Sequence, residues 1–135
     1  MQTIYAHRGA SGYAPENTLR ALDLAADMHA DGVEIDVQRT KDGKLVVFHD
    51  ETLDRVTDGV GPLCMYTYDE LRRFPLVHAA GGSNADVIPL LSDVLALLSR
   101  RSLKLNIELK NSRTPYPGME EEVIGMVEAA GMREQ

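Results

Sequence analysis

Residues 32–38 read GVEIDVQ, and the alternation of apolar and charged residues in this stretch decides the fold. Successive side chains of a β-strand point to opposite faces, so the three apolar residues share one face while Glu34 and Asp36 share the other. Two interpretations of the charged face are open. Either it meets solvent, where such alternation is ordinary, or it is covered, where carboxylates are costly unless they are paired or bound to a cation.

The rest of the chain alternates between strand-like and helix-like patterns. Apolar runs predict further strands over 3–9, 44–50 and 103–110. Apolar residues three or four apart predict helices from about Pro15, and over 67–74, 88–101 and 120–131. Such alternation with short links is typical of an α/β fold with a mostly parallel sheet, as an open sheet or as part of a barrel. A complete (β/α)8 barrel needs about 250 residues, roughly twice the length of this chain.

The first predicted helix has an apolar stripe made of Leu22, Ala25, Ala26 and His29. Pro15 suits its first turn, because a residue there needs no N–H donor. His29 is interpreted as a helix-end or surface histidine and is not assigned to a site.

Composition and charge limit the classes of partner. The 135 residues carry 14 basic and 21 acidic side chains, a formal net charge of −7. This argues against a nucleic-acid or anionic-membrane surface, which needs clustered cations, but a bound divalent cation still permits a small anionic substrate. No apolar run approaches the ~20 residues of a membrane span.

The location of the protein is predicted from its single cysteine and its N-terminus. Cys64 cannot form an internal disulfide, so a reducing compartment fits best. The first predicted strand begins near Thr3, which leaves no room for a signal peptide. We therefore expect a cytoplasmic protein.

The last predicted strand carries a third carboxylate, Glu108, followed by Lys110 on the same face. In α/β folds ligands bind at the carboxyl ends of the strands. Glu34, Asp36 and Glu108 would converge there as a hard oxygen site suited to Ca²⁺ or Mg²⁺.

Two histidines and two cations are placed at the same ends of the strands. A lone histidine usually caps or packs, but His7 and His49 beside a carboxylate cluster suggest a general acid and a general base. Arg8 and Lys110 could then hold a phosphate, Arg8 through its planar fork and Lys110 as a point charge.

Four segments, in this order, closely resemble the glycerophosphodiester phosphodiesterase family. They are HRGASGYAPENT (7–18), GVEIDVQRTKDGKLVVFHDETLDRVTDGVGP (32–62), IPLLSDVL (88–95) and LNIELK (105–110). Phospholipase D-type toxins and phosphatidylinositol phospholipases C have related layouts, but APENT and FHDETLDR favour the glycerophosphodiester branch. The resemblance implies a TIM-type barrel and metal-dependent hydrolysis of glycerophosphodiesters to glycerol 3-phosphate and an alcohol.

The resemblance also implies roles for individual residues. By position these are metal ligands at Glu34, Asp36 and Glu108, an acid–base pair at His7 and His49, and phosphate contacts at Arg8 and Lys110. Asn17 resembles a family position that organises the site near the first histidine. Residues 51–87 resemble a small insertion after the third strand, bordering the substrate pocket.

The chain would then be a single partial domain, residues 1–135, that is the N-terminal half of the barrel without strands five to eight. Three explanations compete: a fragment of a longer chain, a homodimer whose two halves close the barrel, or a binding module. We favour the first. The alternative to an enzyme is a non-catalytic half barrel that binds metal or phosphate without turnover.

Overall fold

A computed structural model describes residues 2–77 and 86–134. Its centre is a four-stranded sheet made of β1 (Tyr5–His7), β2 (Gly32–Arg39), β3 (Leu45–Val47) and β4 (Lys104–Leu109). Strand β2 lies in the middle, parallel to β1 on one edge and parallel to β4 on the other. The register places His7 opposite Glu34, and Asp36 opposite Glu108. The α/β fold class is thus confirmed, with the predicted strands present in shorter form.

Strand β3 is the exception in the mostly parallel sheet, because it runs antiparallel to β2. Only residues 40–44 connect the two strands, whereas a parallel crossover needs a dozen or more residues. Gly43 takes a φ of 81° in this turn, and its N–H donates to the carbonyl of Thr40 at 3.0 Å. Among the described residues the sheet therefore has three parallel strands and one antiparallel strand.

Strands β1 and β3 follow one another along the same edge of β2. The N–H of Arg8 donates to the carbonyl of Glu34 at 3.0 Å, and the N–H of Phe48 donates to the carbonyl of Asp36 at 2.9 Å. Carbonyls two residues apart on a strand face the same edge. The residues after β1 and those after β3 are thus both attached to the carboxyl half of β2.

The first helix, α1 (Leu19–Asp27), begins later than the predicted start at Pro15. Thr18 is its N-cap, and the hydroxyl oxygen of Thr18 accepts a hydrogen bond from the N–H of Ala21 at 3.1 Å. A threonine that satisfies a free N–H of the first turn defines the start better than a proline, which only tolerates that position. His29 lies beyond the end of the helix with a φ of 60°.

The remaining helices differ from the predicted ranges mainly at their ends. They are α2 (Tyr68–Leu71), α3 (Leu91–Leu98) and α4 (Met119–Ala129), with a 3₁₀ turn at Leu63–Met65. The predicted capping box of α2 is present, between Thr67 and Glu70. Helix α3 starts late because Leu90 is extended and forms a β-bridge with Val46.

Two hydrophobic clusters hold the fold together. The larger joins the apolar face of β2 to α1, α3 and α4, and its most buried members include Leu22, Val33, Ile35, Val37 and Leu98. The smaller lies within and beside the predicted insertion, and includes Phe48, Leu53, Leu63 and Leu71. The insertion therefore has a core of its own that contacts the end of β3.

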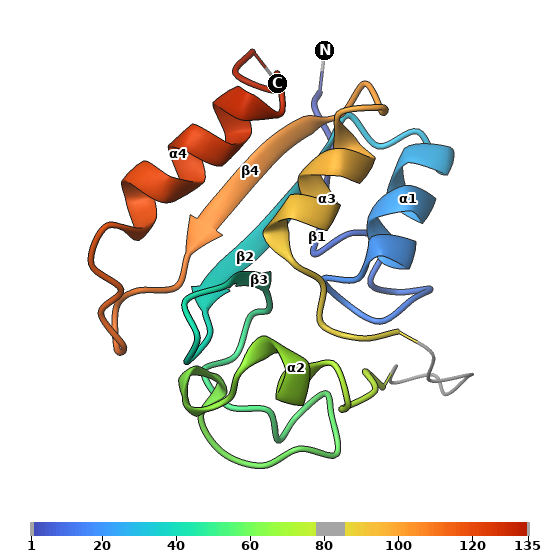
Figure 1. The fold of residues 1–135 in the computed structure, drawn as a ribbon. Helices are drawn as coiled ribbons and strands as arrows, with labels where there is room; N and C mark the ends of the chain where they lie inside the picture. Colours follow the sequence, from blue (N-terminus) through green and yellow to red (C-terminus); the bar gives the residue numbers. More distant parts are fainter. Residues whose placement is uncertain (1, 78–85, 135) are drawn as a thin grey trace.

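Figure 1 shows where the insertion lies. Its green segment, with α2, lies beyond the carboxyl end of β2, while both termini lie at the opposite end of the sheet. Residues 78–85 of the predicted 51–87 region fall outside the described part of the chain. Among the described residues, no helix combines the length and apolarity that a membrane crossing requires.

Candidate active site

Three carboxylates meet at the carboxyl half of β2. Glu34 and Asp36 point to the same face of β2, and Glu108 lies opposite Asp36 on β4. Each offers one oxygen, and these oxygens all lie within 4.8 Å of one another. The side chain of Asp36 is only 1% exposed, which excludes an ordinary solvated sheet face at this position.

Two of these carboxylates carry buried oxygens without a hydrogen-bond partner, Oε2 of Glu34 and Oδ1 of Asp36. Burial, and next the charge of Asp36, raise the pKa of the Glu34 carboxyl. Buried anionic oxygens are rarely left unpaired in proteins. A hard divalent cation, which prefers carboxylate oxygens, fits this donor set.

The buried carboxylate of Asp36 is surrounded by three donors. Its Oδ2 accepts a hydrogen bond from the amide of Asn17 at 2.9 Å and lies 3.5 Å from Nε of Arg8. Its Oδ1 lies 3.4 Å from Nζ of Lys110. Arg8 and Lys110 balance two of the three carboxylate charges, so one formal negative charge is left for a cation.

Lys110 also contacts the most exposed of the three carboxylates. Its Nζ donates to Oε1 of Glu108 at 2.6 Å. This hydrogen bond is the main reason why the pKa of Glu108 is lowered, and the charges of Lys110 and His49 act in the same direction. Glu108 is therefore an ionised oxygen donor at neutral pH.

The loop between β1 and α1 brings Arg8 and Asn17 to Asp36 through two left-handed residues. Arg8 has a φ of 60° and Asn17 a φ of 56°, a region that asparagine tolerates and arginine rarely adopts. The N–H of Asn17 donates to the carbonyl of Arg8 at 2.9 Å, which links the two. Strain of this kind persists only where the surroundings impose it, and it is concentrated at functional sites.

Gly9 allows this loop to approach α1 closely. A Cβ atom at Gly9 would stand 2.7 Å from the carbonyl carbon of Ala21. The neighbouring N–H of Ala10 donates to the carbonyl oxygen of Ala21 at 2.8 Å. The close approach of this loop to α1 therefore requires a glycine at position 9, where any side chain would collide with Ala21.

The two histidines lie near different carboxylates. Nε2 of His7 is 3.7 Å from Oε2 of Glu34, and its side chain is 68% exposed. Nδ1 of His49 is 2.6 Å from Oδ1 of Asp50. His49 and Lys110 line an open cavity of about 450 Å³, together with Asp50, Glu51, Thr52, Ser112 and Arg113. His49 follows the C-terminal end of its strand, as predicted, and that strand is the antiparallel β3.

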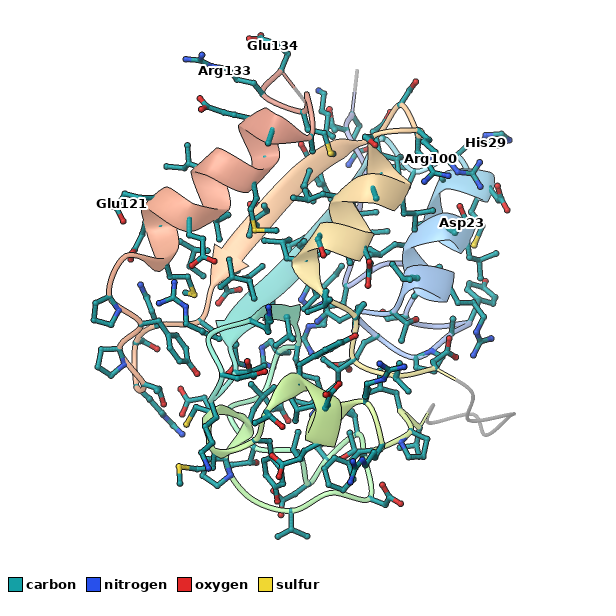
Figure 2. All side chains as sticks on the ribbon, viewed as in Figure 1. Asp23, His29, Arg100, Glu121, Arg133 and Glu134 are labelled. Carbon is teal, nitrogen blue, oxygen red and sulfur yellow. The ribbon has the colours of Figure 1, made fainter. Side chains whose placement is uncertain are left out.

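His29 is the described histidine that is not assigned a role. Figure 2 shows it at the end of α1 away from the carboxyl ends of β2 and β4, where it lines an open cavity together with His7. It is exposed to solvent. This placement agrees with the interpretation of His29 as a helix-end histidine.

Comparison with known proteins identifies the family. Residues 7–134 match the sequence profile described as the glycerophosphoryl diester phosphodiesterase family. The chain belongs to the glycerophosphodiester phosphodiesterase family. It is 49% identical over 130 residues to a glycerophosphodiester phosphodiesterase of Bacillus altitudinis, covering 95% of this chain and 53% of that one. A relative from Caldanaerobacter subterraneus is 41% identical, over 98% of this chain and 55% of its own length.

Solved structures of glycerophosphodiester phosphodiesterases share the fold. The enzyme of Agrobacterium tumefaciens superposes with a TM-score of 0.82 at 38% identity, over 98% of this chain and 55% of that one. A phosphodiesterase of Oleispira antarctica, solved with the product sn-glycerol-3-phosphate, gives 0.77 at 37% identity over 98% and 53%. The chain thus spans about half the length of the relatives it matches, and its fold is that of about half of the family's TIM barrel.

Four residues of the candidate site were missed by sequence reasoning. The amide nitrogen of buried Gln38 is within hydrogen-bond distance of three successive carbonyls, at Phe48, His49 and Asp50. Gln38 lies two residues after Asp36 on the same face of β2, and this spacing could have predicted its place beside the carboxylates. The other three are Glu16, Asp50 and Arg55, which lie in the segments PENT and HDETLDR.

Proposed function

We propose that this glycerophosphodiesterase chain carries the site for metal-dependent hydrolysis of glycerophosphodiesters to glycerol 3-phosphate and an alcohol. The observation that carries the proposal is the group of three carboxylate oxygens within 4.8 Å, bordered by His7 and by the cavity of His49 and Lys110. The Oleispira antarctica relative supports the substrate class, since its structure holds sn-glycerol-3-phosphate.

Glu34, Asp36 and Glu108 would hold the cation, either Ca²⁺ or Mg²⁺, since their oxygens include the two buried ones that have no hydrogen-bond partner. When bound, such a cation withdraws charge from phosphorus and stabilises the charge that develops during displacement. Arg8 and Lys110 would contact the phosphate from the two sides of Asp36. Asn17 would hold the Asp36 carboxylate in place through its 2.9 Å hydrogen bond.

His7 and His49 would divide the proton transfers. One ring nitrogen accepts a proton from the nucleophile, which is water or the glycerol hydroxyl next to the phosphate. As the bond from that oxygen to phosphorus forms, the bond from phosphorus to the head-group oxygen breaks. The other histidine donates a proton to the departing alkoxide, which leaves as an alcohol. Attack by water gives glycerol 3-phosphate directly, whereas attack by the glycerol hydroxyl gives a cyclic phosphodiester that one water then opens to glycerol 3-phosphate, with the roles of the two histidines exchanged.

We also propose that residues 1–135 are one partial barrel domain in which 51–87 is an insertion bordering the substrate pocket. The position of α2 beyond the carboxyl end of β2 supports this placement. A single free cysteine and a net charge of −7 support a cytoplasmic protein without a nucleic-acid partner. Sedimentation tests the homodimer alternative, which a monomeric mass with a cooperative unfolding transition would exclude.

The test is release of glycerol 3-phosphate from glycerophosphocholine by the purified chain, with Mg²⁺ or Ca²⁺ and then with EDTA. Turnover should require the cation and disappear in Glu34→Ala and in His7→Ala. Arg72→Ala is a matched control, because Arg72 is exposed and its ion pair with Asp69 is long at 3.9 Å. Turnover that survives EDTA or Glu34→Ala would contradict the proposal.

A second candidate function is binding of metal or phosphate without turnover. It is favoured by the fact that the chain spans about half the length of its relatives. Calorimetric binding of Ca²⁺ by a folded chain that releases no glycerol 3-phosphate would select this function. Turnover by the same preparation would exclude it.

A further inference from the structure

Arg55, in the insertion, binds two carboxylates that come from different parts of the chain. Its Nη1 and Nη2 donate to the two carboxylate oxygens of Glu16, at 2.9 and 2.6 Å. Its Nε and Nη2 donate to the two oxygens of Asp50, at 2.7 and 3.0 Å. Four charge-assisted hydrogen bonds from one planar guanidinium fix both carboxylates in its plane.

Each of these two carboxylates contacts a residue of the proposed site. Oδ1 of Asp50 lies 2.6 Å from Nδ1 of His49. Oε1 of Glu16 accepts a hydrogen bond from Nη1 of Arg8 at 3.1 Å. One continuous network therefore runs from the acid–base histidine to the phosphate-binding arginine, and Arg55 is its central member.

Charge stabilises this network. The hydrogen bonds from Arg55 are the main reason why the pKa of Asp50 falls to about 2. Partial burial opposes a similar change at Glu16, but hydrogen bonds and charges from Arg55 and Arg8 still hold its pKa below the ordinary value. Both carboxylates are thus ionised at neutral pH and act only as acceptors.

The backbone around Arg55 is held by the core of the insertion. Leu53 is fully buried in the smaller hydrophobic cluster. The hydroxyl of Thr57 donates to the carbonyl of Leu53 at 2.8 Å, and the N–H of Thr57 also donates to it at 3.2 Å. The guanidinium therefore extends from an anchored turn, although its own side chain is partly exposed.

We propose that Arg55 is a positioning residue of the active site, which fixes the ring of His49 through Asp50 and the side chain of Arg8 through Glu16. The proposal rests on the proposed function, because it assigns Arg55 to the acid–base and phosphate-binding residues of that site. The proposal goes beyond the proposed function because it assigns a structural role to the insertion, which joins the β1–α1 loop to the segment after β3.

A specific tautomer of His49 follows from this arrangement. An ionised Asp50 can only accept, so the proton in the contact lies on Nδ1 of His49. The other nitrogen, Nε2, is then unprotonated in the neutral ring and free to accept a proton from a nucleophile. The hydrogen bond at one ring nitrogen sets the state of the other.

The experiment is long-range ¹H–¹⁵N correlation of the histidine rings in the full chain at pH ~8, where histidine is ordinarily neutral. The His49 signals are assigned by their loss in His49→Asn. The wild-type chain should show His49 with the proton on Nδ1. Arg55→Met should convert this to a mixture of tautomers, and Arg55→Lys, which keeps the charge without the fork, should give an intermediate result.

Arg72→Met is the matched control, since Arg72 lies in the same insertion and its ion pair with Asp69 is long, at 3.9 Å. An unchanged tautomer in folded Arg55→Met, or an equal change in Arg72→Met, would overturn the proposal. If Arg55→Met does not fold, Arg55→Lys decides it by the same criterion. The measurement needs no turnover, so an inactive chain with the expected tautomer and the expected response would contradict the proposed function alone.

Discussion

Gly9→Ala should destabilise the fold through a steric conflict that the structure locates. A Cβ at Gly9 would stand 2.7 Å from the carbonyl carbon and 2.8 Å from the carbonyl oxygen of Ala21. Both atoms belong to the backbone of α1 and cannot move like the end of a side chain. Gly43→Ala is the matched control, because Gly43 has nearly the same φ, 81° against 79°, but no atom within 4 Å of a Cβ.

The size of the effect can be worked out from these two environments. Placing an alanine in the left-handed region costs about 1 kcal/mol at either glycine. The collision at Gly9 adds about 1–3 kcal/mol, the range for overpacking. At about 2.1 cal/mol/K per residue, the entropy of unfolding of 135 residues makes 1 kcal/mol equivalent to about 3.5 °C.

Thermal unfolding followed by circular dichroism measures the difference. Gly43→Ala should lower the midpoint by about 3–4 °C, and Gly9→Ala by about 7–14 °C. Equal decreases in the two variants would refute the steric reasoning, because the conformational cost is common to both. A smaller decrease in Gly9→Ala than in Gly43→Ala would refute it as well.

Three further predictions concern α1, the acid dependence of stability and the cation. Thr18→Ala should destabilise the fold by about 1 kcal/mol in urea unfolding, because the N–H of Ala21 loses its acceptor, while Thr18→Ser should restore most of it. The pKa of Asp50 is lowered from 3.8 to about 2, so the contribution of its ionised form to stability is complete above pH 3.8 and is lost as the pH falls towards 2. Asp50→Asn should therefore flatten the dependence of the free energy of unfolding on pH in that interval. An unchanged dependence would contradict the lowered pKa of Asp50. Ca²⁺ at about 100 times its Kd should raise the free energy of unfolding by about 2.7 kcal/mol, EDTA should reverse this, and Glu34→Gln should show neither effect.

The core of the fold and the carboxylate group were predictable because they depend on local rules. The period of two in GVEIDVQ placed Glu34 and Asp36 on one face, and the same rule placed Glu108 on its strand. Parallel pairing of β2 with β4 then brings the three together without any further information. The mutual arrangement of the three carboxylates therefore follows from strand geometry.

Errors arose where two local signals competed. Pro15 and Thr18 are both acceptable near the start of a helix, and the hydrogen bond from Ala21 decides for Thr18. For β3 the short link, residues 40–44, was visible in the sequence and requires an antiparallel partner. The length of this link therefore sets the direction of the strand that leads to His49.

The network around Arg55 had no such signal. Arg55 and Glu16 are 39 residues apart, and no periodicity connects a turn of the insertion with the β1–α1 loop. Their contact depends on the smaller hydrophobic cluster, which packs the insertion against the end of β3. Only the folded structure shows that these charges meet.

The central claim is that Glu34, Asp36 and Glu108 hold a catalytic divalent cation next to the substrate phosphate. The most direct measurement is an anomalous difference map from crystals of this chain soaked with Mn²⁺ and glycerol 3-phosphate. We expect one Mn²⁺ peak bound by the three carboxylates, with the phosphate against Arg8 and Lys110. A map with no peak at these carboxylates, or with the cation and the phosphate bound elsewhere, would contradict it.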